Sequence, residues 1–498
     1  MTNRIKKLVI AGGGTAGWMA AALLSKSMGK TVEITLLESD EIATVGVGEA
    51  TIPPLASFHK MLEIDEREFM SVVNGTFKLG ISFENWREKG HKYIHSFGYA
   101  GKDCWACGFL HFWLAGQAKG VAGDYSEYCV ELLAARDNKF AVLPNGRMNY
   151  AYHMDAGRYA KYLRAYSEKL GVLRREGKIQ AVNICPDQGN ITSLTLTDGT
   201  QIDGDFFIDC TGFRALLIEG ALHTGYEDWS HWLPCDRALA VQTESVSDPV
   251  PYTRSIAHHA GWQWRIPLQT RVGNGLVYSS RYMSDDQARS VLVGNIEGDM
   301  INEPRVIQFR TGTRLKHWNK NCVALGLASG FLEPLESTSI HMIQRSLVRF
   351  IQLFPTNGVQ QSDVDEFNNQ TKVEVERIRD FIILHYKVTN RDDSPFWRYC
   401  KNMSVPEPLR QKIDLFRDTA RVFKSGHELF GEESWLQVMM GQGIMPSSYH
   451  PIVDAMDIEE LTAFLKNIKT SVTSTVGQLP THKEFINFYC KAEMHSSM

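Results

Sequence analysis

The chain has 498 residues, too many for one small core, which predicts two or three closely packed modules. Apolar residues make up 43% and charged residues 22%, an ordinary globular composition that excludes long disordered tracts. The formal net charge of −4 gives no electrostatic basis for binding nucleic acid or an anionic membrane, so small neutral partners are favoured.

The nine cysteines are odd in number and lie mostly in apolar runs, which is typical of free thiols in a reducing compartment. Cys104 and Cys107 form the only close pair, and no second pair completes a zinc site, although a redox dithiol stays open. The apolar run after Lys7 ends at three glycines and is too short for a signal peptide, and no segment is long enough to span a membrane. We therefore expect a cytoplasmic protein with no metal site.

The N-terminal forty residues predict a β-α-β unit. Residues 7–10 are typical of a buried parallel strand, residues 18–28 of a helix, and residues 31–37 of a second strand that ends at Glu38. Three glycines separate the first strand from the helix. This arrangement is typical of a dinucleotide-binding unit.

After this unit, the apolar periodicity that predicts helices and strands is weak at first and becomes clear again near residue 154. Residues 41–150 show few clean periods, whereas residues 154–170 predict a helix. Residues 190–208 predict a hairpin with its turn at residues 198–199. Two more buried strands run directly into glycine turns, at residues 206–212 and 321–330.

Helical patterns dominate after about residue 345, beginning with a helix predicted over residues 338–354. We therefore predict an α/β module over residues 1–345, with an irregular substrate-facing segment at about 50–150, and a helical module over residues 346–498.

Residues 12–17 fit the pattern G-x-G-x-x-G, in which each glycine has a physical role. Gly12 permits a tight turn, Gly14 lets the backbone approach a pyrophosphate, and Gly17 allows helix and strand to pack closely. The pyrophosphate would lie at the helix N-terminus, and the Glu38 carboxylate would accept the ribose hydroxyls. NAD and FAD share this motif, but the two later glycine turns favour one elongated cofactor, FAD. The residues predicted to hold it are Gly12, Gly14, Thr15, Ala16, Gly17, Glu38, Gly48, Ala50 and Leu327.

Residues 261–267 read GWQWRIP and fit the signature G-W-x-W-x-I-P, and with them the chain resembles the flavin-dependent tryptophan halogenase family. Residues 45–53, residues 331–340 and Lys78 within residues 77–80 also match, and the resemblance extends over roughly residues 5 to 400. It implies an FAD-binding Rossmann-like module of the glutathione-reductase or hydroxybenzoate-hydroxylase type, followed by a mostly helical module.

The resemblance also implies a reaction. A separate flavin reductase, without a stable complex, would supply reduced FAD, with which O2 and chloride or bromide give hypohalous acid. That acid would reach Lys78 and halogenate an electron-rich aromatic substrate. Both a monomer and a homodimer remain open.

The two tryptophans of the signature lie at positions i and i+2, so an extended segment would present them on one face. The alternative is a core strand that carries large aromatic side chains. The resemblance makes Trp262, Trp264, Ile266 and Pro267 a wall between cofactor and substrate.

An isolated lysine such as Lys78 is most often solvated. By resemblance it is the catalytic lysine, which either donates a hydrogen bond to hypohalous acid or, if burial lowers its pKa, forms a haloamine. Glu336 precedes a predicted helix and could simply complement the helix dipole. By resemblance it faces the lysine pocket, where it either polarises hypohalous acid or removes the ring proton after attack. The amides of Thr338 and Ser339 match the halide site of the family.

Family members that act on free tryptophan hold it with a tyrosine pair and a glutamate, but residues 435–446 contain no adjacent tyrosines. His111, Phe112 and Trp435 could still hold a flat ring. We therefore expect indole, or an indole, pyrrole or phenol with a larger substituent, as the substrate.

Two other functions remain to be weighed. One is a flavin monooxygenase that inserts oxygen, and the other is a non-catalytic FAD-binding sensor. A sensor would need neither Lys78 nor Glu336 nor the two tryptophans.

Overall fold

The structure is a computed structural model that describes residues 4–41, 48–146 and 148–492. Residues 45–47 of the predicted motif at residues 45–53 lie outside this part of the chain. Among the described residues, no helix has the length and apolar character needed to cross a membrane.

A six-stranded sheet, the nucleotide sheet, is built around the predicted β-α-β unit. Helix α1 (Thr15–Met28) connects its first two strands and begins three residues earlier than predicted, directly at the glycine turn. All strands except the short edge strand β20 run parallel. In spatial order they are β20 (Trp318–Asn319), β21 (Cys322–Ala324), β12 (Phe206–Asp209), β1 (Lys7–Ala11), β2 (Glu33–Glu38) and β8 (Leu173–Glu176).

The three glycine turns predicted from the sequence meet at one edge of this sheet, because the carboxyl ends of parallel strands lie together. The turn at Gly12 follows β1, the 3-10 turn η3 (Gly212–Arg214) follows β12, and η4 (Gly326–Ala328) follows β21. The last two turns contact each other. A Cβ on Gly326 would lie 2.9 Å from the Cβ of Ala16, so the third turn also contacts α1.

Residues 190–208 divide between two sheets. Strands β10 (Ile191–Leu196) and β11 (Gln201–Asp203) form the predicted antiparallel hairpin, together with β9 (Ile179–Ile184). The residues after 205 instead belong to β12 of the nucleotide sheet.

The segment predicted to be irregular contains several short helices and strands, so that prediction was wrong. These elements are too short for a clear period to emerge in the sequence. They are α2 (Pro54–Met61), α3 (Glu66–Val72), β4 (Thr76–Lys78), β5 (Gly80–Glu84), β6 (Lys92–Ser96), α4 (Phe109–Ala118), η1 (Tyr125–Tyr128), α5 (Val130–Arg136) and η2 (Pro144–Gly146).

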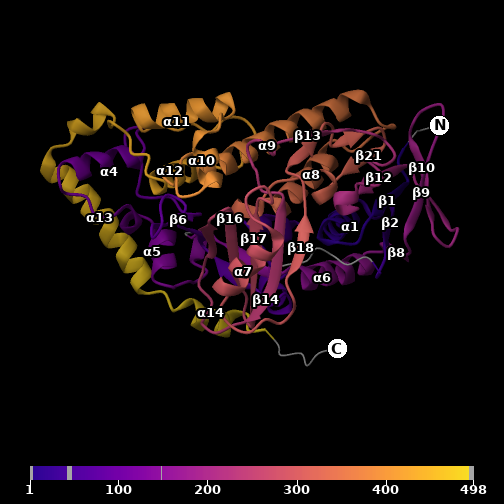
Figure 1. The fold of residues 1–498 in the computed structure, drawn as a ribbon, viewed down its shortest axis with the longest axis horizontal. Coiled ribbons are helices and arrows are strands. Elements are labelled where there is room, and N and C mark those ends of the chain that lie inside the picture. The colour runs from indigo at the N-terminus through magenta and orange to yellow at the C-terminus, as the bar shows by residue number, and fades with distance from the viewer. Residues whose placement is uncertain (1–3, 42–47, 147, 493–498) are drawn as a thin grey trace.

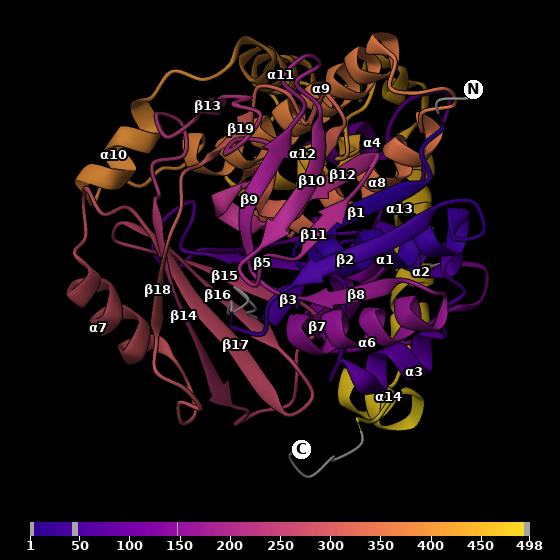
Figure 2. The same cartoon turned by 90° about the vertical axis from the view of Figure 1, so that its right-hand side faces the viewer.

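A seven-stranded sheet lies beside the nucleotide sheet (Figure 2) and carries the tryptophan signature on its strand β16. Its spatial order is β18 (Arg305–Gln308), β14 (Arg237–Glu244), β17 (Arg271–Tyr278), β16 (Gly261–Pro267), β15 (Thr253–His258), β5 and β6. A separate three-stranded sheet, β3 (Gly48–Ala50), β7 (Ala151–Asp155) and β4, carries Lys78 on its edge strand. Helix α6 (Ala156–Lys169) follows β7, close to the predicted helix at residues 154–170. Two short strands, β13 (Tyr226–Asp228) and β22 (Gly330–Phe331), flank β19 (Gly312–Arg314), and α7 (Asp285–Asn295) packs on β17.

The part of the chain described after residue 345 is helical, as predicted. Figure 1 shows α13 at the end of the molecule opposite the nucleotide sheet. Both large hydrophobic clusters combine residues from before and after residue 345, so the division into two modules there stays a prediction. The helices are α8 (Ser339–Gln352), α9 (Gln361–Lys387), α10 (Pro395–Asn402), α11 (Glu407–Thr419), α12 (Glu432–Gly441), α13 (Ile458–Gly477) and α14 (His482–Tyr489), with the 3-10 turn η6 (Pro451–Ala455).

The glycine turn gives a test with a matched control. A Cβ on Gly17 would lie 1.8 Å from the Gly12 carbonyl oxygen, whereas a Cβ on Gly14 would meet no heavy atom within 4 Å. We expect Gly17→Ala to destabilise the flavin-free protein by about 1–3 kcal/mol and Gly14→Ala to leave its thermal midpoint unchanged. Equal midpoints for the two variants, measured by calorimetry, would contradict this packing.

Candidate active site

Lys78 is fully buried at the end of β4, so it is not solvated as most isolated lysines are. Its ammonium Nζ donates to the carbonyl oxygen of Thr51 at 3.0 Å and to Oγ of Ser337 at 2.8 Å. Its Nζ also lies 5.3 Å from the ring centre of Phe97. Burial lowers the pKa of Lys78 to about 7, against the opposing effect of the Glu336 charge. Both protonation states are therefore accessible near neutral pH.

Glu336 is also fully buried, at the end of the 3-10 turn η5 (Pro334–Glu336). Nδ1 of His95 lies 3.0 Å from its Oε2, and Nε2 of His385 lies 2.8 Å from its Oε1. Burial alone would raise the pKa of Glu336, but His95 and His385 together hold it at about 2. The carboxylate is thus ionised inside the protein.

Ser337 joins the two predicted catalytic side chains. It follows Glu336, has a φ of +59° and so occupies the left-handed region, where a residue other than glycine is under strain. This conformation accompanies the placement of its Oγ against Lys78. The structure therefore brings Lys78 and Glu336 into one buried cluster, although 258 positions separate them in the sequence.

The predicted halide residues lie where α8 begins. Ser339 is the first residue of the helix and Thr338 is its N-cap, without a side-chain cap. Within the described residues, neither backbone N–H donates to a protein acceptor, and the buried Oγ1 of Thr338 has no partner. Unpaired donors at a helix N-terminus attract a small anion.

The tryptophan signature forms a fully buried strand, which confirms the extended conformation that the wall requires. Trp262 and Trp264 lie on one face with ring centres 6.2 Å apart. Nε1 of Trp262 donates to Oε2 of Glu333 at 2.9 Å, and the same oxygen accepts from the Tyr386 hydroxyl at 2.5 Å. Burial raises the pKa of Glu333 to about 7.

The wall is also tied to the strand that carries Lys78. Oγ1 of Thr76 in β4 donates to the carbonyl oxygen of Pro267 at 2.6 Å, and Ile266 beside it is buried. Wall, lysine strand and Glu336 turn therefore form one continuous packed unit.

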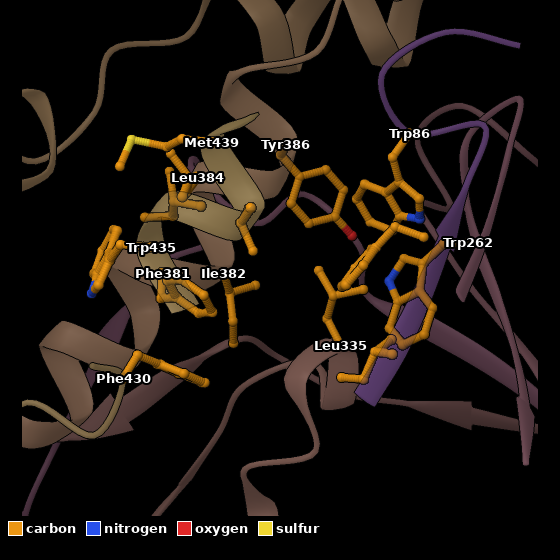
Figure 3. Packing of buried hydrophobic residues seen from close by; sticks show 14 of the residues in the cluster. Trp86, Trp262, Leu335, Phe381, Ile382, Leu384, Tyr386, Phe430, Trp435 and Met439 are labelled. Carbon is orange, nitrogen blue, oxygen red and sulfur yellow. The ribbon is translucent and has the colours of Figure 1, made fainter. Parts of the chain in front are cut away.

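Only one of the three aromatic residues predicted to hold a ring lies near this cluster. Trp435 in α12 packs edge-on against Phe381, with ring centres 4.8 Å apart, and the Phe381 ring lies 5.7 Å from that of His95. Figure 3 shows Phe381, Phe430 and Trp435 as one group and Trp86, Trp262 and Tyr386 as another.

His111 and Phe112 instead pack against the C-terminal helices. Nδ1 of His111 accepts from the backbone N–H of His450 at 3.1 Å, and the Phe112 ring lies 5.2 Å from that of Phe464 in α13. Among the described residues, no hydrogen bond or ring contact connects either with Lys78 or Glu336.

The glycine turn has the shape that a dinucleotide needs. Gly12 has a φ of +112°, and a Cβ there would lie 2.3 Å from the Cys210 carbonyl oxygen. The space beside Gly14 is open, and Thr15, Ala16 and Gly17 start α1, which has no acidic residue in its first turn. An anionic pyrophosphate fits this helix N-terminus.

Glu38 ends β2 beside the same turn. Its carboxylate accepts from Nε1 of Trp18 at 3.2 Å, from Arg164 at 3.3 Å and from Arg174. Leu327 lies in the neighbouring turn η4, whereas Gly48 and Ala50 lie on β3, which pairs with β7.

Sequence reasoning missed several side chains of the cluster: Glu333, Ser337, His95, Phe97 and His385. No local spacing connects the two histidines with Glu336. His95 lies 241 positions before Glu336, and His385 lies on the separate helix α9. Glu333 was visible inside the matching segment at residues 331–340, but its carboxyl group had no evident partner until Trp262 and Tyr386 were placed.

The structure thus contains a dinucleotide-type glycine turn, a buried lysine and glutamate, and a fully buried strand with two tryptophans. The chain belongs to the tryptophan halogenase family, whose model, described as Tryptophan halogenase, matches residues 7–458. It is therefore an enzyme, and this membership decides against the oxygen-inserting and non-catalytic alternatives.

Individual relatives agree with this assignment. Xcc4156, a flavin-dependent halogenase from Xanthomonas campestris, is 56% identical with a TM-score of 0.97, and the match covers 99% of this chain and 100% of that one. BrvH, a flavin-dependent halogenase from Brevundimonas sp. BAL3, is 44% identical with a TM-score of 0.94 and coverage of 98% and 100%. Tryptophan 7-halogenase RebH from Lentzea aerocolonigenes is 33% identical, with 98% of this chain and 99% of that protein covered. The similarity to solved halogenases confirms the predicted fold class.

The burial of Lys78 predicts how stability depends on pH. The native pKa is about 7 and the ordinary value is 10.5, so between these values the unfolded chain binds a proton that the native protein does not. Rising pH therefore favours the native state, by up to about 1.4 kcal/mol per pH unit.

We expect the thermal midpoint of the wild type to rise relative to that of Lys78→Met between pH 7 and pH 10. Other groups titrate in both proteins and cancel in the difference. Parallel midpoints across this range would show that Lys78 keeps an ordinary pKa.

Proposed function

We propose that this halogenase uses reduced FAD, O2 and chloride or bromide to form hypohalous acid, which Lys78 directs to an electron-rich aromatic substrate. The observation that carries the proposal is the buried cluster in which Lys78 and Glu336 lie next to the unpaired amides of Thr338 and Ser339. Oxidant, halide and substrate sites would then share one turn of the chain.

Gly12, Gly14 and Gly17 would hold the FAD pyrophosphate, with Glu38 at the ribose, and Gly48, Ala50 and Leu327 along the cofactor. When bound, reduced flavin would activate O2 as the oxidant of the halide ion. We assign reduction of the flavin to a separate reductase that forms no stable complex, as the family resemblance implies. The protein's own task is then to hold halide, to guide hypohalous acid and to orient the substrate.

Lys78 would receive hypohalous acid. As an ammonium it would donate a hydrogen bond to the acid, and as a neutral amine it would carry the halogen as a haloamine. A pKa of about 7 makes both forms available and selects neither.

Glu336 would accept the ring proton that the substrate loses after attack. The alternative role is to polarise hypohalous acid, and both roles use the ionised carboxylate that lies between His95 and His385. The amides of Thr338 and Ser339, one turn away, would hold the halide on the flavin side.

The wall formed by Trp262, Trp264, Ile266 and Pro267 would keep the aromatic substrate from the flavin. Its complete burial and its tie to Glu333 support a rigid barrier. Small hypohalous acid would pass where a ring would not.

Indole, or an indole, pyrrole or phenol with a larger substituent, fits the substrate side better than free tryptophan. Trp435 and Phe381 are flat apolar side chains in the packed cluster beside His95. Glu433, a half-buried acid of α12, already accepts from the Tyr125 hydroxyl at 3.1 Å and from Gln437 at 3.0 Å, and desolvation raises its pKa to about 7. It is therefore poorly suited to bind an ammonium group.

The direct test is product analysis. Purified protein with a flavin reductase, indole and bromide should give haloindole that requires halide, and chloride and bromide in competition define the preference. Lys78→Ala should lower the halogenated product by at least about 100-fold while flavin binding persists. Hydroxylated indole formed without halide, or full halogenation by Lys78→Ala, would contradict the proposal.

A further inference from the structure

The strand that carries Lys78 is buried but has few backbone partners within its own sheet. Strand β4 is only three residues long and lies at the edge of its sheet, paired with β7 on one side. An edge strand needs another partner for its outward backbone groups when it is buried. For Phe77, the middle residue of β4, that partner comes from the far end of the chain.

His482, the first residue of α14, completes the edge of β4. Its Nε2 accepts the backbone N–H of Phe77, the residue next to Lys78, at 3.1 Å. Its Nδ1 lies 2.8 Å from the carbonyl oxygen of Pro249, which can only accept a hydrogen bond. The ring is therefore the neutral tautomer with a proton on Nδ1 and a lone pair on Nε2, and burial lowers the pKa of His482 to about 4.

The segment around His482, residues 480–492, is here called the C-terminal clasp. Its start is anchored by Phe140, whose N–H donates to the Pro480 carbonyl at 3.2 Å, and by a capping box between Thr481 and Glu484. The Phe485 ring lies 5.5 Å from that of Phe77. The clasp thus fixes both the backbone and the side chain of Phe77.

The end of the clasp holds the residues that precede β4. Nε2 of Gln269 donates to the Gly75 carbonyl at 2.8 Å and to the Cys490 carbonyl at 3.0 Å, and Ala492 donates back to Gln269 at 2.7 Å. The clasp lies after residue 458, where the match to the family model ends.

We propose that His482 is a positioning residue, through which the C-terminal clasp aligns the strand of Lys78 for halogen transfer. The inference rests on the proposed role of Lys78. Loss of the hydrogen bond to Phe77 would let a three-residue edge strand shift, and a displacement of ~1 Å can cost on the order of 100-fold in rate. Flavin binding, at the distant glycine turn, would be unaffected.

Two polar substitutions separate this role from simple packing. In His482→Gln, the side-chain oxygen reaches the position of Nε2 and can accept from Phe77. In His482→Asn, the shorter amide keeps a donor for Pro249 but does not reach Phe77. Phe488→Ala is the control on the same helix, since this side chain is 81% exposed.

The measurement is the amount of haloindole formed per reduced flavin consumed, together with kcat, the KM for indole, flavin affinity and the thermal midpoint. We expect Phe488→Ala to match the wild type and His482→Gln to stay within about threefold of it. His482→Asn should lose roughly 10- to 100-fold in kcat and in product yield, with KM and flavin affinity retained.

Equal kcat for His482→Asn and His482→Gln would overturn the proposal, as would an activity loss explained by a lowered thermal midpoint or lost flavin. Hydrogen exchange provides a second measurement: the peptide containing Phe77 should exchange faster in His482→Asn than in His482→Gln, and equal exchange also overturns it. Lys78→Ala, assayed in parallel, distinguishes failure of the proposed function from failure of the role of His482. Full activity of Lys78→Ala defeats the proposed function, whereas an inactive Lys78→Ala with an active His482→Asn defeats only the role of His482.

Discussion

Two consecutive side chains of α9, His385 and Tyr386, hold the two glutamates of one short turn. His385 pairs with Glu336 at 2.8 Å and Tyr386 donates to Glu333 at 2.5 Å. The backbone then enters the left-handed region at Ser337 and starts α8 two residues later. Lys78, the tryptophan wall and the helix N-terminus all contact this turn, so α9 sets the geometry of the whole site.

The turn also explains how so much charge is buried. The Glu336 carboxylate lies between two histidines. Burial lowers the pKa of Lys78, and its Nζ donates hydrogen bonds to Thr51 and Ser337. Removing one partner of such a buried pair leaves a charge uncompensated, at a cost of about 3–5 kcal/mol. This coupling keeps Glu336 ionised and Lys78 close to its titration point near neutral pH.

What the sequence could predict follows from how local each signal is. The glycine turn at residues 12–17 and the later strand-to-glycine turns were correctly predicted, because strand, turn and helix are contiguous there. Family resemblance added Lys78, Glu336 and the extended tryptophan strand, which the structure places in one unit. The partners His95, His385 and His482 were not predictable, since each meets its target from a distant segment.

Two further differences have the same origin. Elements of three to ten residues within the segment predicted to be irregular carry too few side chains to show a period. His111 and Phe112 looked like ring-binding residues because aromatic composition does not reveal direction, and they face α13 and His450 instead.

The central claim is that the turn after Glu336 holds halide beside the lysine cluster. Anomalous diffraction from crystals of the FAD-bound protein grown in bromide tests it most directly. We expect a bromide peak within hydrogen-bond distance of the Thr338 and Ser339 amides. Ordered bromide elsewhere, with these amides bound to other groups, would contradict it.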